Sequence, residues 1–382
     1  MRWIRARWLL FAGGGVALAL LVGMWMVYVA NERRSLRARA DEAASNRDID
    51  PGSPAGDVPA PDFKLRDQQG RLTALGEFRG KVVVLTFVDS QCTTICPLMT
   101  ESMVRALDLL GPDAAQVQLL GINANPLATQ ISDVAAYTRV HQMQGRWRFL
   151  TGSLPQLKRV WSAYHVYVAA IHNDIDHQPV IVLIGPQGRE RTIYLTQLSY
   201  EGVDQQAQVL AEGIARLIPG HPAVRKAVSL RQIPPLKPTD MVQLPAVGAS
   251  RQEIMLGGPH PHLCLFFAGW LDEESSLRKK LVALDVYAAT ARQHGLPPPV
   301  AIDELPTEAS ATAARSLLTR LAATLHVPIT EDEQGRLAEG YDVQDLPWFV
   351  LTSRSGKILW QHDGWLSSTD LGLQVRVALA GH

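Results

Sequence analysis

Two segments of this 382-residue chain share one pattern, which is the strongest constraint on its fold. They read "HQPVIVLIGPQGRERTIYL" at residues 177–195 and "LPWFVLTSRSGKILWQHDG" at residues 346–364. Each has a proline, an apolar strand, a polar turn with glycine and a second strand, which predicts a β-hairpin. Strand and helix patterns alternate before each hairpin, and a helix pattern follows it. We therefore predict an internal duplication of one α/β fold.

The order within each half, βαβα followed by a hairpin and a helix, is that of a thioredoxin-like domain. We predict two such domains in tandem, at residues 61–218 and 257–382, joined by a Pro-rich linker at 219–256. The chain length also predicts about two domains. Apolar residues make up 47% of the chain, which is enough for two hydrophobic cores.

An uncharged apolar segment near the N-terminus predicts a membrane anchor. It runs from Trp8 to Ala30, and about 20 such residues cross the bilayer hydrocarbon as a helix. A cleaved signal peptide is the alternative, but its apolar core spans only about 7–15 residues and a small-residue cleavage motif follows it. We assign residues 1–30 to a transmembrane anchor. Residues 31–60, first charged and then rich in Ala, Gly, Ser and Pro, are predicted to form a flexible linker.

Cys92 and Cys96 lie between a predicted central strand, "KVVVLTFV", and a helical pattern that extends to Leu110. If the helix begins near Thr93, the spacing of four places both sulfurs on one helix face. A helix N-terminus favours thiolates, which are nucleophiles and soft metal ligands. The pair is therefore suited to disulfide exchange or to Cu(I). A structural disulfide is the third possibility, although so small a loop adds little stability.

A labile metal site needs a third ligand, and the segment "IHNDIDHQPV" offers one. It lies just before the first hairpin strand, at the edge of the sheet that faces the strand–helix loop in a thioredoxin fold. His177 adjoins that strand and is the predicted ligand, with His172 as the alternative. Two further possibilities stay open, a plain surface role for His177 and a hard-cation site at Asp174 and Asp176.

The segment "FVDSQCTTICPLMT" resembles the Cys–x–x–x–Cys–Pro motif of the Sco/SenC family of copper-binding thioredoxin-like proteins. The segments "WRFLTG", "LKRVWSAYHV" and "DHQPVIVLIGPQG" are similar to later blocks of that family and occur in the same order. The Asp176–His177 step matches the family's distal histidine. The sequence "TTI" between the cysteines departs from the Pro–Asp that is frequent there. Over residues 60 to 218, the resemblance implies copper binding by Cys92, Cys96 and His177.

The resemblance also implies a role in assembling the copper site of cytochrome c oxidase. The leading hypothesis is a copper chaperone rather than an enzyme, whose partner is the copper-bearing oxidase subunit or another cuproprotein. The second is an enzyme, a thiol–disulfide oxidoreductase with Cys92 and Cys96 as its redox pair. The third is a membrane-tethered interaction protein with a regulatory cysteine pair. The formal net charge of zero argues against nucleic acid as a partner.

Thiolate pairs persist as disulfides or metal sites outside the cytosol. Residues 31–382 are therefore predicted to lie on the periplasmic or extracytoplasmic side of the inner (cell) membrane. The three cysteines of the chain are too few for a disulfide-stapled scaffold.

In the predicted second domain, "FFAGWLDEESS" stands where the first domain has its cysteine loop. Trp270 is retained, whereas Leu271 and Glu274 take the places of the two cysteines of a thioredoxin motif. We predict a thioredoxin-like fold that lacks the redox centre. The bond between Leu346 and Pro347 is predicted to be cis.

The segment "HPHLC" places His260, His262 and Cys264 on alternate residues, so that they share one face of a strand. The favoured interpretation is a buried Cys264 that acts as a small hydrophobic residue at the start of a strand. A soft-metal site is the alternative.

Overall fold

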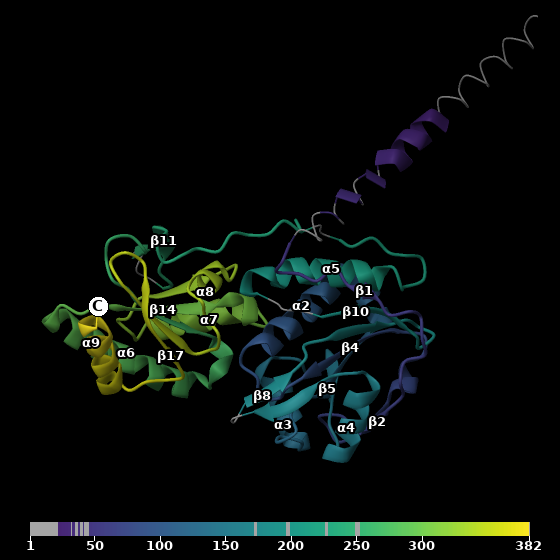
Figure 1. Ribbon diagram of the computed structural model, residues 1–382, viewed down its shortest axis with the longest axis horizontal. Coiled ribbons are helices and arrows are strands. Elements are labelled where there is room, and N and C mark those ends of the chain that lie inside the picture. Colours follow the sequence, from purple (N-terminus) through teal and green to yellow (C-terminus); the bar gives the residue numbers. More distant parts are fainter. Residues whose placement is uncertain are drawn as a thin grey trace, which may run out of the picture.

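The computed structural model describes residues 22–31, 33–34, 37–38, 41, 46–171, 174–195, 199–225, 228–248 and 253–381. Most of the predicted membrane segment, Trp8 to Ala30, lies outside these residues. Among the residues described, none of the helices is both long and apolar enough to cross a bilayer. The folded part has two lobes, each built around its own β-sheet (Figure 1).

The sheet of the first lobe has six strands in the order β1-β10-β9-β4-β5-β6. These strands are β1 (Ser53–Pro54), β4 (Val82–Val88), β5 (Val117–Asn123), β6 (Trp147–Leu150), β9 (Ile181–Ile184) and β10 (Glu190–Tyr194). The α-helices are α2 (Ile95–Leu110), α3 (Ile131–Val140), α4 (Leu154–Ala163) and α5 (Val203–Ala215). The 3₁₀ helices are η1 (Leu75–Phe78), η2 (Gly111–Gln116) and η3 (Tyr200–Gly202). Two hairpins complete the lobe, β2 (Lys64–Arg66) with β3 (Leu72–Ala74), and β7 (Val168–Ile171) with β8 (Asp174–His177).

The central strand β4 is buried on both faces, which explains its continuous apolar sequence. It runs parallel to β5 and antiparallel to β9. Helices α2 and α5 pack together over one face of the sheet (Figure 1). Alternate residues of β4 enter the core on that side, namely Val82, Val84 and Val88. The others enter the core that includes α4, namely Val83, Leu85 and Phe87.

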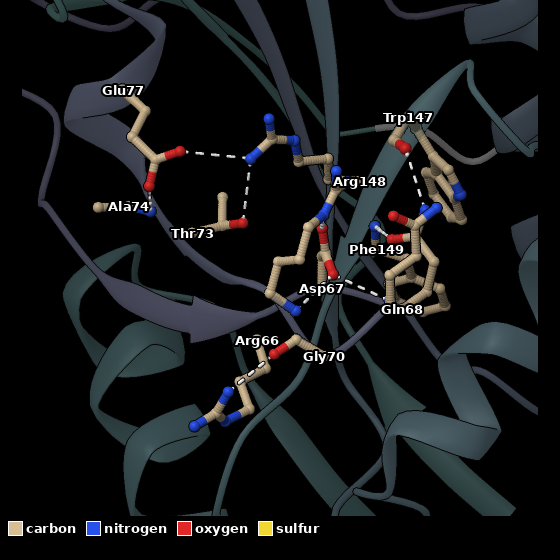
Figure 2. Close-up of polar contacts among 12 residues, drawn as sticks. Arg66, Asp67, Gln68, Gly70, Thr73, Ala74, Glu77, Trp147, Arg148 and Phe149 are labelled. Carbon is tan, nitrogen blue, oxygen red and sulfur yellow. Dashed lines mark hydrogen bonds and ion pairs between the residues drawn. The ribbon is translucent and has the colours of Figure 1, made fainter.

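The open edge of β6 is covered by a side chain rather than by another strand (Figure 2). Gln68 Nε2 donates to the Trp147 carbonyl oxygen at 3.2 Å, and the Phe149 N–H donates to Gln68 Oε1 at 2.8 Å. Arg148 of the same strand forms an ion pair with Glu77 at 3.3 Å. An uncovered edge invites pairing with another chain, and these contacts reduce that risk.

The sheet of the second lobe has five strands in the order β15-β14-β13-β16-β17. The strands of the lobe are β11 (Val242–Pro245), β12 (Glu253–Leu256), β13 (Leu263–Phe267), β14 (Pro299–Glu304), β15 (Ile329–Asp332), β16 (Trp348–Thr352) and β17 (Ile358–Asp363). Its helices are η4 (Gly269–Leu271), α6 (Glu274–His294), η5 (Leu305–Thr307), α7 (Ala311–Ala322), α8 (Arg336–Gly340) and α9 (Ser368–Ala380).

The two lobes repeat one strand order, since β6-β5-β4-β9-β10 corresponds position by position to β15-β14-β13-β16-β17. In both, the central strand pairs in parallel with one neighbour and in antiparallel with the other. The α/β class and both predicted hairpins are confirmed. The Leu346–Pro347 peptide bond is cis, as predicted.

Two segments predicted to be linkers contribute to the folded lobes. Within residues 31–60, the part from Asn46 onward is not a free tether, because β1 pairs with β10 and Ile49 is buried in the first core. Within residues 219–256, Leu230 is buried and β11 pairs with β12. Both segments are rich in turn-forming residues, and short strands among such residues leave little periodic signal.

Candidate metal centre

The two cysteines lie at the junction between β4 and α2, as the sequence predicted. The helix begins at Ile95 and not near Thr93, so Cys92 precedes it and only Cys96 lies in its first turn. The prediction of two sulfurs on one helix face is therefore wrong. A bond from the Cys96 N–H to Cys92 Sγ at 3.4 Å still brings Cys92 back over the helix start.

The two cysteines are both free thiols, and their pKa values are shifted in opposite directions. Hydrogen bonding from the Cys96 thiol lowers the pKa of Cys92, with further help from Thr94, whose Oγ1 lies 3.3 Å from Cys92 Sγ. The interaction with Cys92, together with burial, raises the pKa of Cys96 well above its usual value. The pair therefore loses its first proton from Cys92, which makes Cys92 the better nucleophile and the stronger soft donor.

His177 reaches the cysteines from a hairpin that was not predicted. It is the last residue of β8, where it pairs with Val168 of β7. Its Nε2 lies 3.6 Å from Cys96 Sγ, although the two residues are 81 positions apart in the chain. The structure thus brings the three predicted site residues Cys92, Cys96 and His177 together.

The three side chains do not form a closed coordination shell. Within the described part of the chain, no group of three or more His, Cys, Asp or Glu side chains is arranged to hold a metal ion. The donors touch pairwise, with Cys92 linked to Cys96 and Cys96 linked to His177. Two sulfurs and one imidazole nitrogen nevertheless form a donor set that suits Cu(I) and not Mg²⁺ or Ca²⁺. Metal binding would require the three donors to close around the ion.

Two polar residues behind the cysteine loop were missed by the sequence analysis. Asp89 is buried at the end of β4, where its Oδ1 accepts from the Gln91 N–H at 2.8 Å and from Asn125 Nδ2 at 2.7 Å. Its backbone carbonyl accepts from the Cys92 N–H at 3.2 Å. Asp89 therefore fixes the loop geometry. The available signal was that Asp89 and Asn125 follow parallel strands, whose carboxyl ends share one edge of the sheet.

The other candidates have different surroundings. His172 and the side chain of Asp174 lie outside the described residues, and Asp176 is exposed. In the second lobe, Cys264 is fully buried in β13, as predicted, and burial raises the pKa of its thiol to about 12. His262 Nε2 lies 2.9 Å from the Gly257 carbonyl oxygen.

Two solved structures are similar to part of this chain. A structure of Arabidopsis thaliana ScoI with copper bound is 22% identical, covers 42% of this chain and 99% of its own, and gives a TM-score of 0.37. BsSco, described as a member of the Sco family of cytochrome c oxidase assembly proteins, is 21% identical, covers 38% of this chain and 87% of its own, and gives a TM-score of 0.34.

The sequence of the first lobe identifies its family. The SCO1/SenC family model matches residues 53–212, which include β4, the cysteine loop and β8. The mitochondrial SCO2 homolog of Bos taurus is 30% identical over 208 residues, an alignment that covers 52% of this chain and 73% of the relative. The fold is therefore α/β, with a thioredoxin-like Sco domain followed by a second α/β domain, and the chain belongs to the SCO1/SenC family.

Proposed function

We propose that this protein is a copper chaperone that carries Cu(I) on Cys92, Cys96 and His177. The observation that carries the proposal is the 3.6 Å approach of His177 Nε2 to Cys96 Sγ. This approach adds a nitrogen donor to two thiols that are already linked to each other. A disulfide exchange centre needs no such ligand, whereas a carrier of soft metal ions gains affinity and selectivity from it.

The proposed partner follows from membership of the SCO1/SenC family, and the proposed location follows from the thiol chemistry. Copper is the cargo, and the receiver is the copper-bearing subunit of cytochrome c oxidase or another cuproprotein with thiolate ligands. We place the protein in the inner (cell) membrane through residues 1–30, with its folded lobes on the periplasmic side, where such thiol sites persist. The corresponding strand orders also support a tandem of two thioredoxin-like domains, at 61–218 and 257–382. The second has no cysteine pair.

Removing any one donor should abolish stoichiometric copper binding. The chain with its thiols reduced is titrated with Cu(I) in the presence of a competing chelator, and bound copper is measured per protein. We expect one Cu(I) for the unaltered chain and none for Cys92→Ser, Cys96→Ser or His177→Ala. A three-coordinate soft site that loses one ligand should lose affinity by at least about 10- to 100-fold, because even outer-shell partners of metal ligands contribute that much.

Matched controls separate ligand loss from general damage. Cys264→Ala removes the third cysteine, which lies in the second lobe. His326→Ala removes a histidine whose side chain is 88% exposed. Both variants should bind copper like the unaltered chain. Copper binding that survives in His177→Ala would remove His177 from the site.

A second candidate function, disulfide reduction, is favoured by the opposed acidities of the two thiols. The Cys92 thiolate would attack a disulfide of the client and release one client sulfur as a thiol. Cys96 would then give up its proton and attack Cys92, so that a Cys92–Cys96 disulfide forms and the second client thiol leaves. Two electrons pass to the client. The test is the same copper titration combined with a disulfide-reduction assay. If neither the unaltered chain nor any variant binds copper, while the reduced protein still reduces a model disulfide, disulfide reduction is the function and copper transport is not.

A further inference from the structure

The cysteine loop is hydrogen-bonded to the second lobe. Thr93, which lies between the two cysteines, donates from Oγ1 to Asp345 Oδ1 at 2.5 Å across 252 positions of sequence. Asp345 directly precedes the Leu346–Pro347 bond and also accepts from the Leu346 N–H at 2.7 Å. The side chain that contacts the cysteine loop is thus held in place by the backbone of the next residue.

Two further contacts extend this interface along α2 and α3. The ring of Trp270 lies 4.7 Å from the ring of His141, measured between centroids, just beyond the end of α3. The guanidinium of Arg105 on α2 lies 3.4 Å from the Pro306 carbonyl oxygen. On the second lobe, Trp270 and Pro306 follow the parallel strands β13 and β14, and Asp345 shortly precedes the antiparallel strand β16. One end of the second sheet therefore supplies all three contacts.

The end of the second sheet that docks corresponds to the end of the first sheet that carries the cysteine loop. β13 occupies the position of β4 in the strand order, and the loop after β4 contains Cys92. The second lobe thus places its cysteine-free counterpart of the cysteine loop on the first lobe, where Trp270 meets His141. Asp345, which precedes β16, contacts the cysteine loop itself. The apolar core on the α2 side also continues from one lobe into the other, with Trp270 and Trp348 packed against it.

The interface holds polar groups that the docked form leaves without partners. Within the part of the chain that the structure describes, Tyr200 Oη, both carboxyl oxygens of Glu304 and Trp348 Nε1 are buried and make no hydrogen bond. Tyr200 packs against Gly335 of the second lobe, and the Glu304 carboxyl lies near enough to Tyr200 to act on its pKa. Trp348 packs against the core that both lobes share, so these groups lie close to where the lobes meet. Buried groups of this kind weaken an interface, because water would bond to them once the lobes separate. The docking is therefore suited to reversible opening.

Docking places the second lobe beside the thiols and narrows the approach to them. Cys96 has no exposed surface, and Cys92 is only partly exposed. A protein that receives copper must bring its own donors within bonding distance of the ion, so it competes with the second lobe for the surface around Thr93. A cavity of about 400 Å³ remains beside the loop, bordered by Thr94 and Ile95 from one lobe and by Glu339 and Asp342 from the other.

We propose that the second lobe is a reversible cover that occupies, in cis, the client-docking surface of the first. That surface consists of Thr93, Arg105 and His141. It fits a client that offers an acceptor oxygen to Thr93 and Arg105 and an aromatic ring to His141, as Asp345, Pro306 and Trp270 do. Only the identity of the client rests on the proposed function, since the cover itself would equally restrict disulfide exchange.

The test measures how fast Cys92 reacts with iodoacetamide in the reduced, copper-free full chain. A Cys264→Ala background leaves only the paired thiols to react, and peptide mass spectrometry assigns the alkylated residue. Trp270→Ala deletes the ring contact and should raise the open fraction, and with it the Cys92 rate, by roughly two- to tenfold. Asp345→Ala deletes the acceptor of Thr93 and should raise the rate in the same direction.

Trp365→Ala is the matched control, because this half-buried tryptophan belongs to the core of the second lobe and stacks on Lys280. Its rate should equal that of the background chain. Circular dichroism identifies any variant that does not fold. If Trp270→Ala does not fold, the comparison uses Asp345→Ala alone. Equal rates of Cys92 alkylation in Trp270→Ala, Asp345→Ala and Trp365→Ala would overturn the proposal that the second lobe covers the docking surface. Alkylation requires no copper, so this result and the copper titration can fail independently.

Discussion

Replacing Gly335 with alanine should separate the two lobes and lower the free energy of unfolding by about 2–5 kcal/mol. Gly335 has a φ of +70°, which costs an L-residue about 1–2 kcal/mol. A Cβ atom there would also lie 2.4 Å from the Tyr200 carbonyl carbon and Cβ. Two of the three nearest atoms belong to the backbone of the other lobe, so the contact is relieved only by moving the lobes apart.

Gly295→Ala supplies a control with the same backbone penalty and no clash. Gly295 has a φ of +65° after the end of α6, and a Cβ atom would meet nothing within 4 Å. Gly295→Ala should lower the free energy of unfolding only by the cost of the positive φ, about 1–2 kcal/mol, and the lobes should stay docked. Urea unfolding gives the stability difference, and small-angle X-ray scattering gives the radius of gyration. An unchanged radius of gyration in Gly335→Ala would contradict the assigned interface.

The parts of the fold that the sequence predicted are those with periodic or continuous apolar patterns. β4 reads as seven buried residues in a row, and its burial on both faces is what a central strand requires. The same applies to the two hairpins, in which an apolar strand, a glycine turn and a second strand lie close together in sequence. Cys92 and Cys96 could be predicted as site residues because they directly follow β4 in the sequence. All of these predictions rest on patterns within short stretches of the chain.

The parts that the sequence did not predict depend on contacts between distant residues. His177 was chosen for its position before a strand, but its approach to Cys96 comes from the hairpin of β7 and β8, whose sequence "VAAI" and "DIDH" has no strong strand pattern. Asp89 and Asn125 look like ordinary polar loop residues until the parallel pairing of β4 and β5 brings them together. No local pattern in "LDEES" or "QDLP" predicts that the second lobe docks on the first.

Raising the pH from about 5 to about 8 should destabilise the docked protein. Burial, reinforced by the charges of Glu339 and Asp48, raises the pKa of Glu201 to about 8. Burial also raises the pKa of Glu308 to about 7 and that of Asp332 to about 6. In the unfolded chain such carboxyls titrate near about 4.

The sign follows from proton counting. Between about pH 5 and 8 the docked protein holds protons on these carboxyls that the unfolded chain has already released, so stability falls as the pH rises. For Glu201, which is only 4% exposed, we expect a loss on the order of 3 kcal/mol across this range. The loss should appear as a falling urea midpoint, because each additional proton released on unfolding favours the unfolded chain at higher pH.

Glu201→Gln removes the titrating group that the two lobes bury together, since the charges around it come from both Asp48 and Glu339. The variant should match the unaltered chain near pH 5 and exceed its stability near pH 8. Glu333→Gln is the control, because its side chain is 71% exposed and pairs only with Arg315 among the described ion pairs. It should keep the pH slope of the unaltered chain. If stability falls with pH equally steeply in Glu201→Gln and Glu333→Gln, Glu201 keeps a low pKa in the docked form. The conclusion that Glu201 is buried at the lobe junction would then be wrong.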